Sequence, residues 1–272
     1  MKTALPPGAC DCHVHIYDER YALAPTATFK PPHSPVSAYG QVQSALGLQR
    51  VVLVQPTGYG FDNRCLLDAL GQLGNTARGV AIVAADTGDE QLQRLHAAGV
   101  RGLRYMLLPG SGGLMRWDDV PDAAARIAPL GWALNLQFDG RELPQRQALI
   151  DCLPCKVVID HIGRFVEPVT VRDPAFKALL SVLDRERRWV KLSGPYETSR
   201  SGPPGYDDVS ALARALAARH PDRCLWASNW PHPNRDPVPA NADMLALLDD
   251  WVPDADVRAS ILVANARAAY DF

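Results

Sequence analysis

The feature that most constrains this chain is an alternation of short apolar runs with helical patterns, repeated eight times along its 272 residues. Several of the runs, including VVLV at 51–54 and VVI at 157–159, are apolar at every position. Continuous apolar runs are typical of strands that are covered on both faces in a parallel sheet. The predicted strands are residues 9–17, 50–57, 78–84, 100–107, 132–139, 156–161, 189–194 and 224–229.

Helical patterns fill the gaps between these strands, and several of them begin at an Asp or Ser that can cap the free amide groups of the first turn. The predicted helices are residues 37–46, 62–73, 89–98, 120–128, 144–152, 173–185, 207–219 and 240–250, with one further helix over 254–268. No Pro/Gly/Ser-rich linker interrupts the series, and no G-x-G-x-x-G fingerprint follows the first strand. The pattern therefore predicts one α/β domain over residues 1–272, a single (β/α)8 TIM barrel, rather than an open doubly wound sheet.

Composition excludes several classes of protein. The chain has 28 basic and 30 acidic side chains and is 47% hydrophobic, which argues against a disordered chain and against a nucleic-acid-binding protein. No run approaches 18 consecutive apolar residues, and the first ten residues lack the apolar stretch of a signal peptide. We expect a cytoplasmic protein with no membrane partner, whose oligomeric state stays open.

In a TIM barrel the chemistry sits at the carboxyl ends of the strands. The first predicted strand carries His13 and His15, which a period of two places on one face, toward the barrel mouth. The sixth strand ends in the sequence DHIGR, which adds His161 at the same rim and Arg164 in the following loop. The sequence therefore predicts three imidazoles converging on a pocket that can also clamp a carboxylate.

These motifs, together with NWPHP at 229–233, resemble the amidohydrolase superfamily. Within it they resemble a lactone-processing group that contains 2-pyrone-4,6-dicarboxylate lactonase and D-galactarolactone isomerase. The resemblance covers essentially the whole chain and includes residues 54–55, 62–63, 102–104, 137–140, 160–164 and 196–200. It implies a TIM barrel and an enzyme that acts on lactones.

Metal-dependent relatives of this fold hold their ions with the first-strand His pair, a mid-barrel Lys or acid, further His residues and an eighth-strand Asp. This chain has Gln137 in the fifth strand and Asn229 at the eighth-strand position. A neutral amide is a poor zinc ligand and cannot accept a proton from bound water. We therefore expect no cofactor; the alternative is a divalent metal held by His13, His15 and His161.

Loss of the general base for water favours isomerisation, in which a hydroxyl of the substrate itself attacks the lactone carbonyl. We expect a metal-independent enzyme that isomerises an aldarolactone and so resembles D-galactarolactone isomerase. The alternative is a lactone hydrolase resembling the pyrone lactonase, in which Asn229 is either native or an engineered replacement of Asp. The predicted catalytic residues are His13, His15, His161 and Asn229.

The expected partner is a small-molecule lactone with a free carboxylate. Arg104, Arg164 and Arg200 are predicted to bind the carboxylate, because guanidinium groups bind carboxylates in a bidentate manner. The predicted partners of its hydroxyl groups are Tyr59, Gln137, Tyr196 and His232. Two further alternatives stay open: a binding protein without turnover, and a metal-dependent decarboxylase or amide hydrolase.

Overall fold

The strands form where the apolar runs predict them, in a computed structural model that describes residues 4–272. They lie in one eight-stranded sheet in chain order, and each pairs with the next in parallel. The strands are β1 (Cys10–Val14), β2 (Arg50–Val54), β3 (Ala77–Ala81), β4 (Val100–Met106), β5 (Ala133–Gln137), β6 (Lys156–Ile159), β7 (Arg188–Leu192) and β8 (Cys224–Trp226).

The sheet closes where the last strand meets the first. The His15 amide donates to the Trp230 carbonyl at 2.8 Å, and the Asn229 amide donates to the His13 carbonyl at 3.1 Å. Closure removes the sheet edges. This arrangement confirms the predicted (β/α)8 barrel, and it brings the first and eighth strand ends together.

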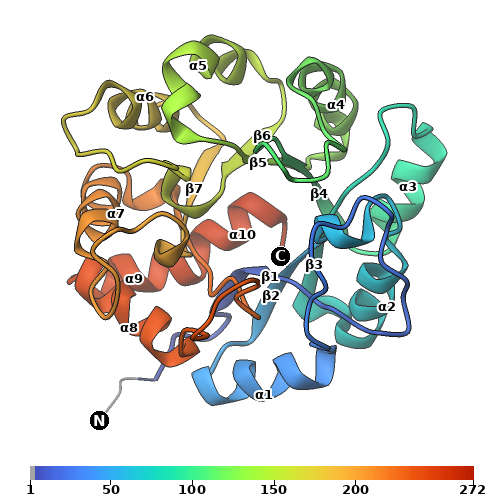
Figure 1. Ribbon diagram of the computed structural model, residues 1–272, viewed down its shortest axis with the longest axis horizontal. Helices are drawn as coiled ribbons and strands as arrows, with labels where there is room; N and C mark the ends of the chain where they lie inside the picture. The colour runs from blue at the N-terminus through green and yellow to red at the C-terminus, as the bar shows by residue number, and fades with distance from the viewer. Residues whose placement is uncertain (1–3) are drawn as a thin grey trace.

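Helices surround the strands as a ring (Figure 1). They are α1 (Val36–Leu46), α2 (Arg64–Leu73), α3 (Asp89–Ala97), α4 (Val120–Ile127), α5 (Leu143–Cys152), α6 (Pro174–Leu183), α7 (Asp207–Arg219) and α8 (Asn241–Trp251). Each matches a predicted helix to within two residues at either end. Asp173 caps α6 as predicted, because its carboxylate accepts from the Ala175 amide at 2.8 Å.

The single helix predicted over 254–268 is wrong. The tail forms two helices, α9 (Ala255–Leu262) and α10 (Ala264–Tyr270), because Val263 between them has φ −122° and ψ −67°, outside the helical region. Apolar periodicity continues across this break, so the sequence pattern did not reveal it.

Helix α10 covers the amino-terminal end of the barrel. The Lys156 ammonium, at the start of β6, donates to the Ala268 carbonyl at 2.8 Å. The Asn135 amide, inside the barrel, donates to the buried Tyr270 hydroxyl at 2.9 Å. Because this end is covered, a ligand would enter from the carboxyl ends of the strands. Among the helices of residues 4–272, none has both the length and the apolar character needed to cross a bilayer.

Candidate active site

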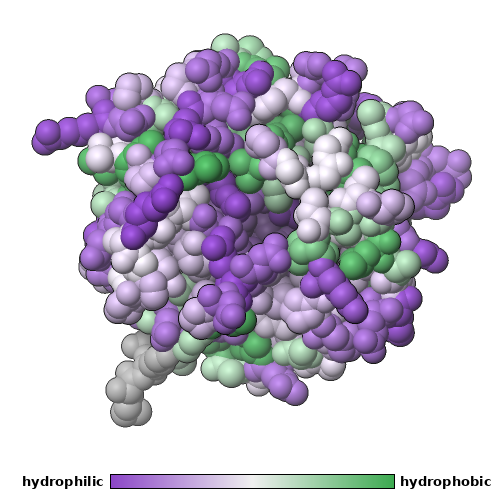
Figure 2. Space-filling model, in the orientation of Figure 1, coloured by the Kyte–Doolittle hydropathy of each residue, from purple (hydrophilic) through white to green (hydrophobic). Residues whose placement is uncertain are grey.

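A cavity of about 280 Å³ lies over the carboxyl ends of the strands. The space-filling view has a hollow near its centre, with strongly hydrophilic surface beside it (Figure 2). Segments after β1, β4 and β8 contribute part of the cavity wall. Six of the predicted site residues line it: His15, Arg104, Gln137, His161, Arg164 and Asn229.

A tight turn after β6 brings two of these side chains to the cavity. His161, Ile162 and Arg164 have φ values of 51°, 56° and 47°, in the left-handed region that is costly for residues with a β-carbon. For the β-branched Ile162 this conformation is a clear outlier. Such strain persists only where the surrounding structure enforces it, and it is concentrated at functional sites.

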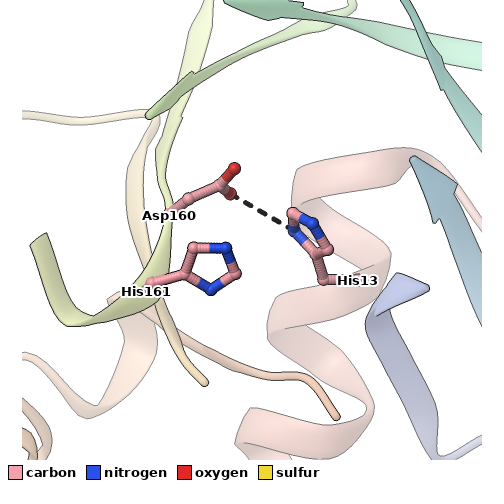
Figure 3. A group of neighbouring side chains, drawn as sticks. All are labelled: His13, Asp160 and His161. Atoms are coloured by element: carbon pink, nitrogen blue, oxygen red, sulfur yellow. Dashed lines mark ion pairs between the residues drawn. The ribbon is translucent and has the colours of Figure 1, made fainter. Parts of the chain in front are cut away.

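The predicted histidines converge. The Nε2 atoms of His13 and His15 lie 3.2 Å apart, and the ring centres of His13 and His161 lie 4.8 Å apart. The side chains of His13, Asp160 and His161 are turned toward one another, with 3.6 Å between His13 Nδ1 and Asp160 Oδ1 (Figure 3). His161 Nδ1 lies 2.9 Å from the Ser193 hydroxyl oxygen. His13 is fully buried beneath the cavity, and His15 and His161 form part of its wall.

All three imidazoles are kept neutral. Burial lowers the pKa of His13 well below its ordinary value, and the nearby Lys191 ammonium lowers it further. Burial, reinforced by Arg104, lowers the pKa of His15 to about 3. Burial also lowers the pKa of His161 well below its ordinary value. A neutral imidazole has one N–H that donates and one nitrogen whose lone pair accepts, so each ring can join a hydrogen-bonded series.

His13, Asp160 and His161 are close enough together to be tested as a metal site, since their ligand atoms lie within 4.8 Å of one another. However, the Lys191 ammonium nitrogen lies 3.0 Å from both His13 Nδ1 and Asp160 Oδ1. A cation therefore already compensates the only carboxylate of the group, and a divalent ion there would be repelled. The three predicted metal ligands, His13, His15 and His161, bring no negative charge of their own. The Lys191 cation beside Asp160 counts against a divalent metal at this position.

Asn229 occupies the wall at the β8 end with φ +62°, a conformation that Asn adopts more readily than most residues. Its Nδ2 atom donates to the Tyr196 hydroxyl at 3.0 Å and to Glu197 Oε1 at 3.3 Å. The Tyr196 hydroxyl in turn lies 2.7 Å from His232 Nδ1, and His232 Nε2 lies 2.9 Å from Asn241 Oδ1. Both N–H bonds of the Asn229 amide are thus engaged, so it can offer a ligand only its Oδ1, a hydrogen-bond acceptor.

Arginines supply the positive charge of the cavity. Arg104 is buried and donates to the Gln55 carbonyl at 3.0 Å and to Gln137 Oε1 at 2.8 Å, while its buried Nε has no hydrogen-bond partner among residues 4–272. Arg164 pairs with Glu197 at 3.0 Å. Because Arg104 is bonded only to neutral oxygens, its full charge remains available to an anionic ligand.

The other predicted residues lie outside the cavity wall. The Tyr59 hydroxyl is used by the Asp18 backbone, donating to its carbonyl and accepting from its amide. Arg200 is exposed and pairs with Glu167. Tyr196 and His232 stand behind Asn229 and orient it. The position of a residue in a strand or motif does not determine where its side chain points or what it contacts. The sequence therefore could not distinguish these residues from those that line the cavity.

The structure adds three residues that the sequence reasoning did not assign to the site. Lys191 is fully buried among the histidines, and its presence in the apolar strand WVKL was a signal that could have found it. Glu197 and Arg235 line the cavity and pair with each other at 2.6 Å. Arg235 lies in a polar segment after β8 with nothing in the local sequence to mark it.

Comparisons with known proteins agree with this geometry. The family model described as amidohydrolase matches residues 10–272. The chain is 34% identical to a 2-pyrone-4,6-dicarboxylate hydrolase from Comamonas testosteroni over 98% of this chain and 91% of that protein. It is also 34% identical to a D-galactarolactone isomerase from Agrobacterium fabrum, over 98% and 92%.

Among solved structures, an apo crystal structure from Agrobacterium tumefaciens superimposes with a TM-score of 0.93 at 32% identity. The match covers 99% of this chain and 97% of that one. Fold, motifs and family model therefore agree, and this chain belongs to the amidohydrolase family.

Proposed function

We propose that this chain is an enzyme that isomerises a carboxylate-bearing sugar-acid lactone, an aldarolactone, without a metal. The names of two relatives of equal identity, a lactone-type hydrolase and a lactone isomerase, support action on lactones in general. Arg104 and Arg164 in the cavity wall support a substrate with a free carboxylate.

The observation that carries the choice of isomerisation is the state of Asn229. A hydrolase needs a base for water near the scissile carbonyl, whereas this amide is neutral and has both N–H bonds engaged. Its Oδ1 can accept a hydrogen bond from a substrate hydroxyl and so hold that hydroxyl in place for attack.

In the proposed reaction a substrate hydroxyl oxygen forms a bond to the lactone carbonyl carbon, and its proton passes to a neutral imidazole of the cavity. The tetrahedral intermediate then expels the original ring oxygen, which takes the proton back. His161 is suited to carry this proton, because it lines the cavity and one of its two ring nitrogens is engaged by Ser193. The Arg104 guanidinium can stabilise the negative charge that develops on the carbonyl oxygen. No water is consumed, and atoms and charge balance.

Hydrolysis is the second candidate, favoured by the name of the Comamonas relative. Among the described residues that line the cavity, Glu197 is the one carboxylate available as a base for water. Its Oε2 is held by Arg164 at 3.0 Å and by Arg235 at 2.6 Å. Its Oε1 accepts from Asn229 Nδ2 at 3.3 Å, so protein donors already engage both carboxylate oxygens, which counts against this route.

The test is a proton NMR time course of chelator-treated protein with a panel of sugar-acid lactones and pyrone dicarboxylate, run in H₂¹⁸O. Isomerisation yields a second lactone without ¹⁸O, as measured by mass spectrometry of the product. Hydrolysis yields an open-chain acid with one ¹⁸O per turnover. An Arg104→Met variant and a no-enzyme sample serve as controls. A product that carries ¹⁸O, or turnover that needs added metal, would overturn the proposal.

A further inference from the structure

Three buried side chains beneath the cavity, Lys191, His13 and His15, form a hydrogen-bonded series. Lys191 Nζ lies 3.0 Å from His13 Nδ1, and the two Nε2 atoms of His13 and His15 lie 3.2 Å apart. The series ends where His15 Nδ1 meets the Val54 carbonyl oxygen at 2.7 Å. Lys191 and His13 are fully buried, so bulk water does not replace either partner of their contact.

The direction of every bond in this series can be deduced from its last member. A carbonyl oxygen only accepts, so His15 Nδ1 carries a hydrogen, and in the neutral ring His15 Nε2 then carries none. His13 Nε2 must therefore donate to it, which leaves a lone pair on His13 Nδ1. That nitrogen needs a donor, and Lys191, whose ammonium can only donate, lies at hydrogen-bond distance.

Asp160 explains why the donor has to be a cation. Its Oδ1 lies 3.6 Å from the same His13 Nδ1, and two acceptors at that distance repel each other. Lys191 Nζ lies 3.0 Å from Asp160 Oδ1 as well, so the ammonium separates the two acceptors and neutralises the carboxylate. Without it, His13 would gain by taking a proton at Nδ1, toward Asp160.

From this geometry we propose that Lys191 is a positioning residue that holds His13 in its Nε2–H tautomer and His15 in its Nδ1–H tautomer. In this arrangement His13 donates its Nε2–H hydrogen bond to His15 and so fixes the ring of His15 in the cavity wall. Lys191 itself does not line the cavity, so it acts through the two histidines and not on the substrate. Only the activity assay of this proposal rests on the proposed function, because the two tautomers can be measured in the absence of substrate.

The primary test is long-range ¹H–¹⁵N correlation NMR at pH 7 on the whole protein with ¹⁵N-labelled histidines. His13→Asn and His15→Asn variants assign the two rings. The expected spectrum has neutral His13 protonated at Nε2 and neutral His15 protonated at Nδ1. A His13 ring protonated at Nδ1, or an imidazolium, would overturn the proposal, because Asp160 and not Lys191 would then control the ring. This measurement uses no substrate, so its failure is distinct from a failure of the lactone assay.

Variants then test whether Lys191 is the cause. In Lys191→Met the Asp160 carboxylate faces His13 directly, so His13 should become an imidazolium at pH 7, donating to Asp160 and to His15. The other groups around His13 are His161, Arg104 and Arg164, and all three stay unchanged. Adding Asp160→Asn places an amide donor near His13 Nδ1, so the double variant should regain the neutral Nε2–H tautomer.

The activity pattern should follow the tautomers. Lys191→Met is expected to lower kcat by about 100-fold, the size of a geometric misplacement in an active site, with KM within about threefold of the parent. The double variant should recover at least about tenfold of that loss, and the exposed Lys177→Met control should match the parent. A Lys191→Met protein that folds and keeps both the parent tautomers and the parent kcat would overturn the assignment. If Lys191→Met does not fold, the spectrum of the parent still decides the question.

Discussion

Asn229→Asp changes one atom of a buried side chain and tests the electrostatics of the cavity wall. The introduced oxygen would replace Nδ2, which lies 3.3 Å from Glu197 Oε1. Two unit charges at that distance repel by about 5 kcal/mol at an effective dielectric constant of 20. Asn229 is 2% exposed, so bulk water screens the pair little.

Proton uptake limits this cost. At pH 7 a carboxyl with an ordinary pKa near 3.9 can be protonated for about 4 kcal/mol, at about 1.4 kcal/mol per pH unit. Repulsion of this size raises the pKa of the introduced carboxyl in the folded state, and protonation limits the penalty to about 4 kcal/mol. Arg164 and Arg235, beside Glu197, offset part of the repulsion. We therefore expect a loss of about 3 kcal/mol at pH 7, or a Tm lowered by roughly 6–12 °C.

The sign of the pH dependence follows from the raised pKa. The folded state holds a proton that the unfolded state has released, so the penalty shrinks as pH falls toward 5, where its limit is about 1.5 kcal/mol. The assay is thermal unfolding of parent and variant from pH 5 to 8, repeated in a Glu197→Gln background. That background should remove most of the variant's penalty. A penalty below about 1 kcal/mol at pH 7, or one independent of both pH and Glu197, would refute the reasoning.

Three further predictions concern the same molecule. Arg104→Met should lower kcat/KM for a carboxylate-bearing lactone by about 10- to 100-fold, the value of a charge-assisted hydrogen bond. Steady-state kinetics measure this change, and the exposed Arg214→Met variant serves as an unchanged control. Burial raises the pKa of Asp11 from 3.8 to about 6, so Asp11 contributes stability that is present below pH 3.8 and lost as pH rises through about 6. Across this range the free energy of unfolding should fall by about 3 kcal/mol in the parent and not in Asp11→Asn. Unfolding experiments that find the same pH dependence in both proteins would contradict this prediction. Because the pKa of His161 lies well below its ordinary value, kcat should be flat between pH 6 and 8, and an inflection near pH 6.5 would show that a solvated histidine controls turnover.

The sequence by itself determined the barrel and the place of its site. Apolar runs of strand length and helical periodicity are local properties, and their eightfold alternation leaves few closed arrangements. The period of two along β1 likewise put His13 and His15 on one face, and the motif after β6 brought His161 to the same rim. The tail helix was the exception, because apolar periodicity runs through Val263 while the backbone there does not stay helical.

Only the tertiary structure decided which side chains come into contact and which hydrogen-bond partner each one has. Tyr59 and Arg200 follow strand ends as the sequence suggested, yet one bonds to a loop backbone and the other to a surface carboxylate. Lys191 and Glu197 enter the site from β7 and its following turn, next to residues more than 30 positions away in the chain. The physical reason is that secondary structure depends on neighbours in sequence, whereas the charge, tautomer and direction of a buried polar group depend on whichever partners the closed barrel places within about 3 Å of it.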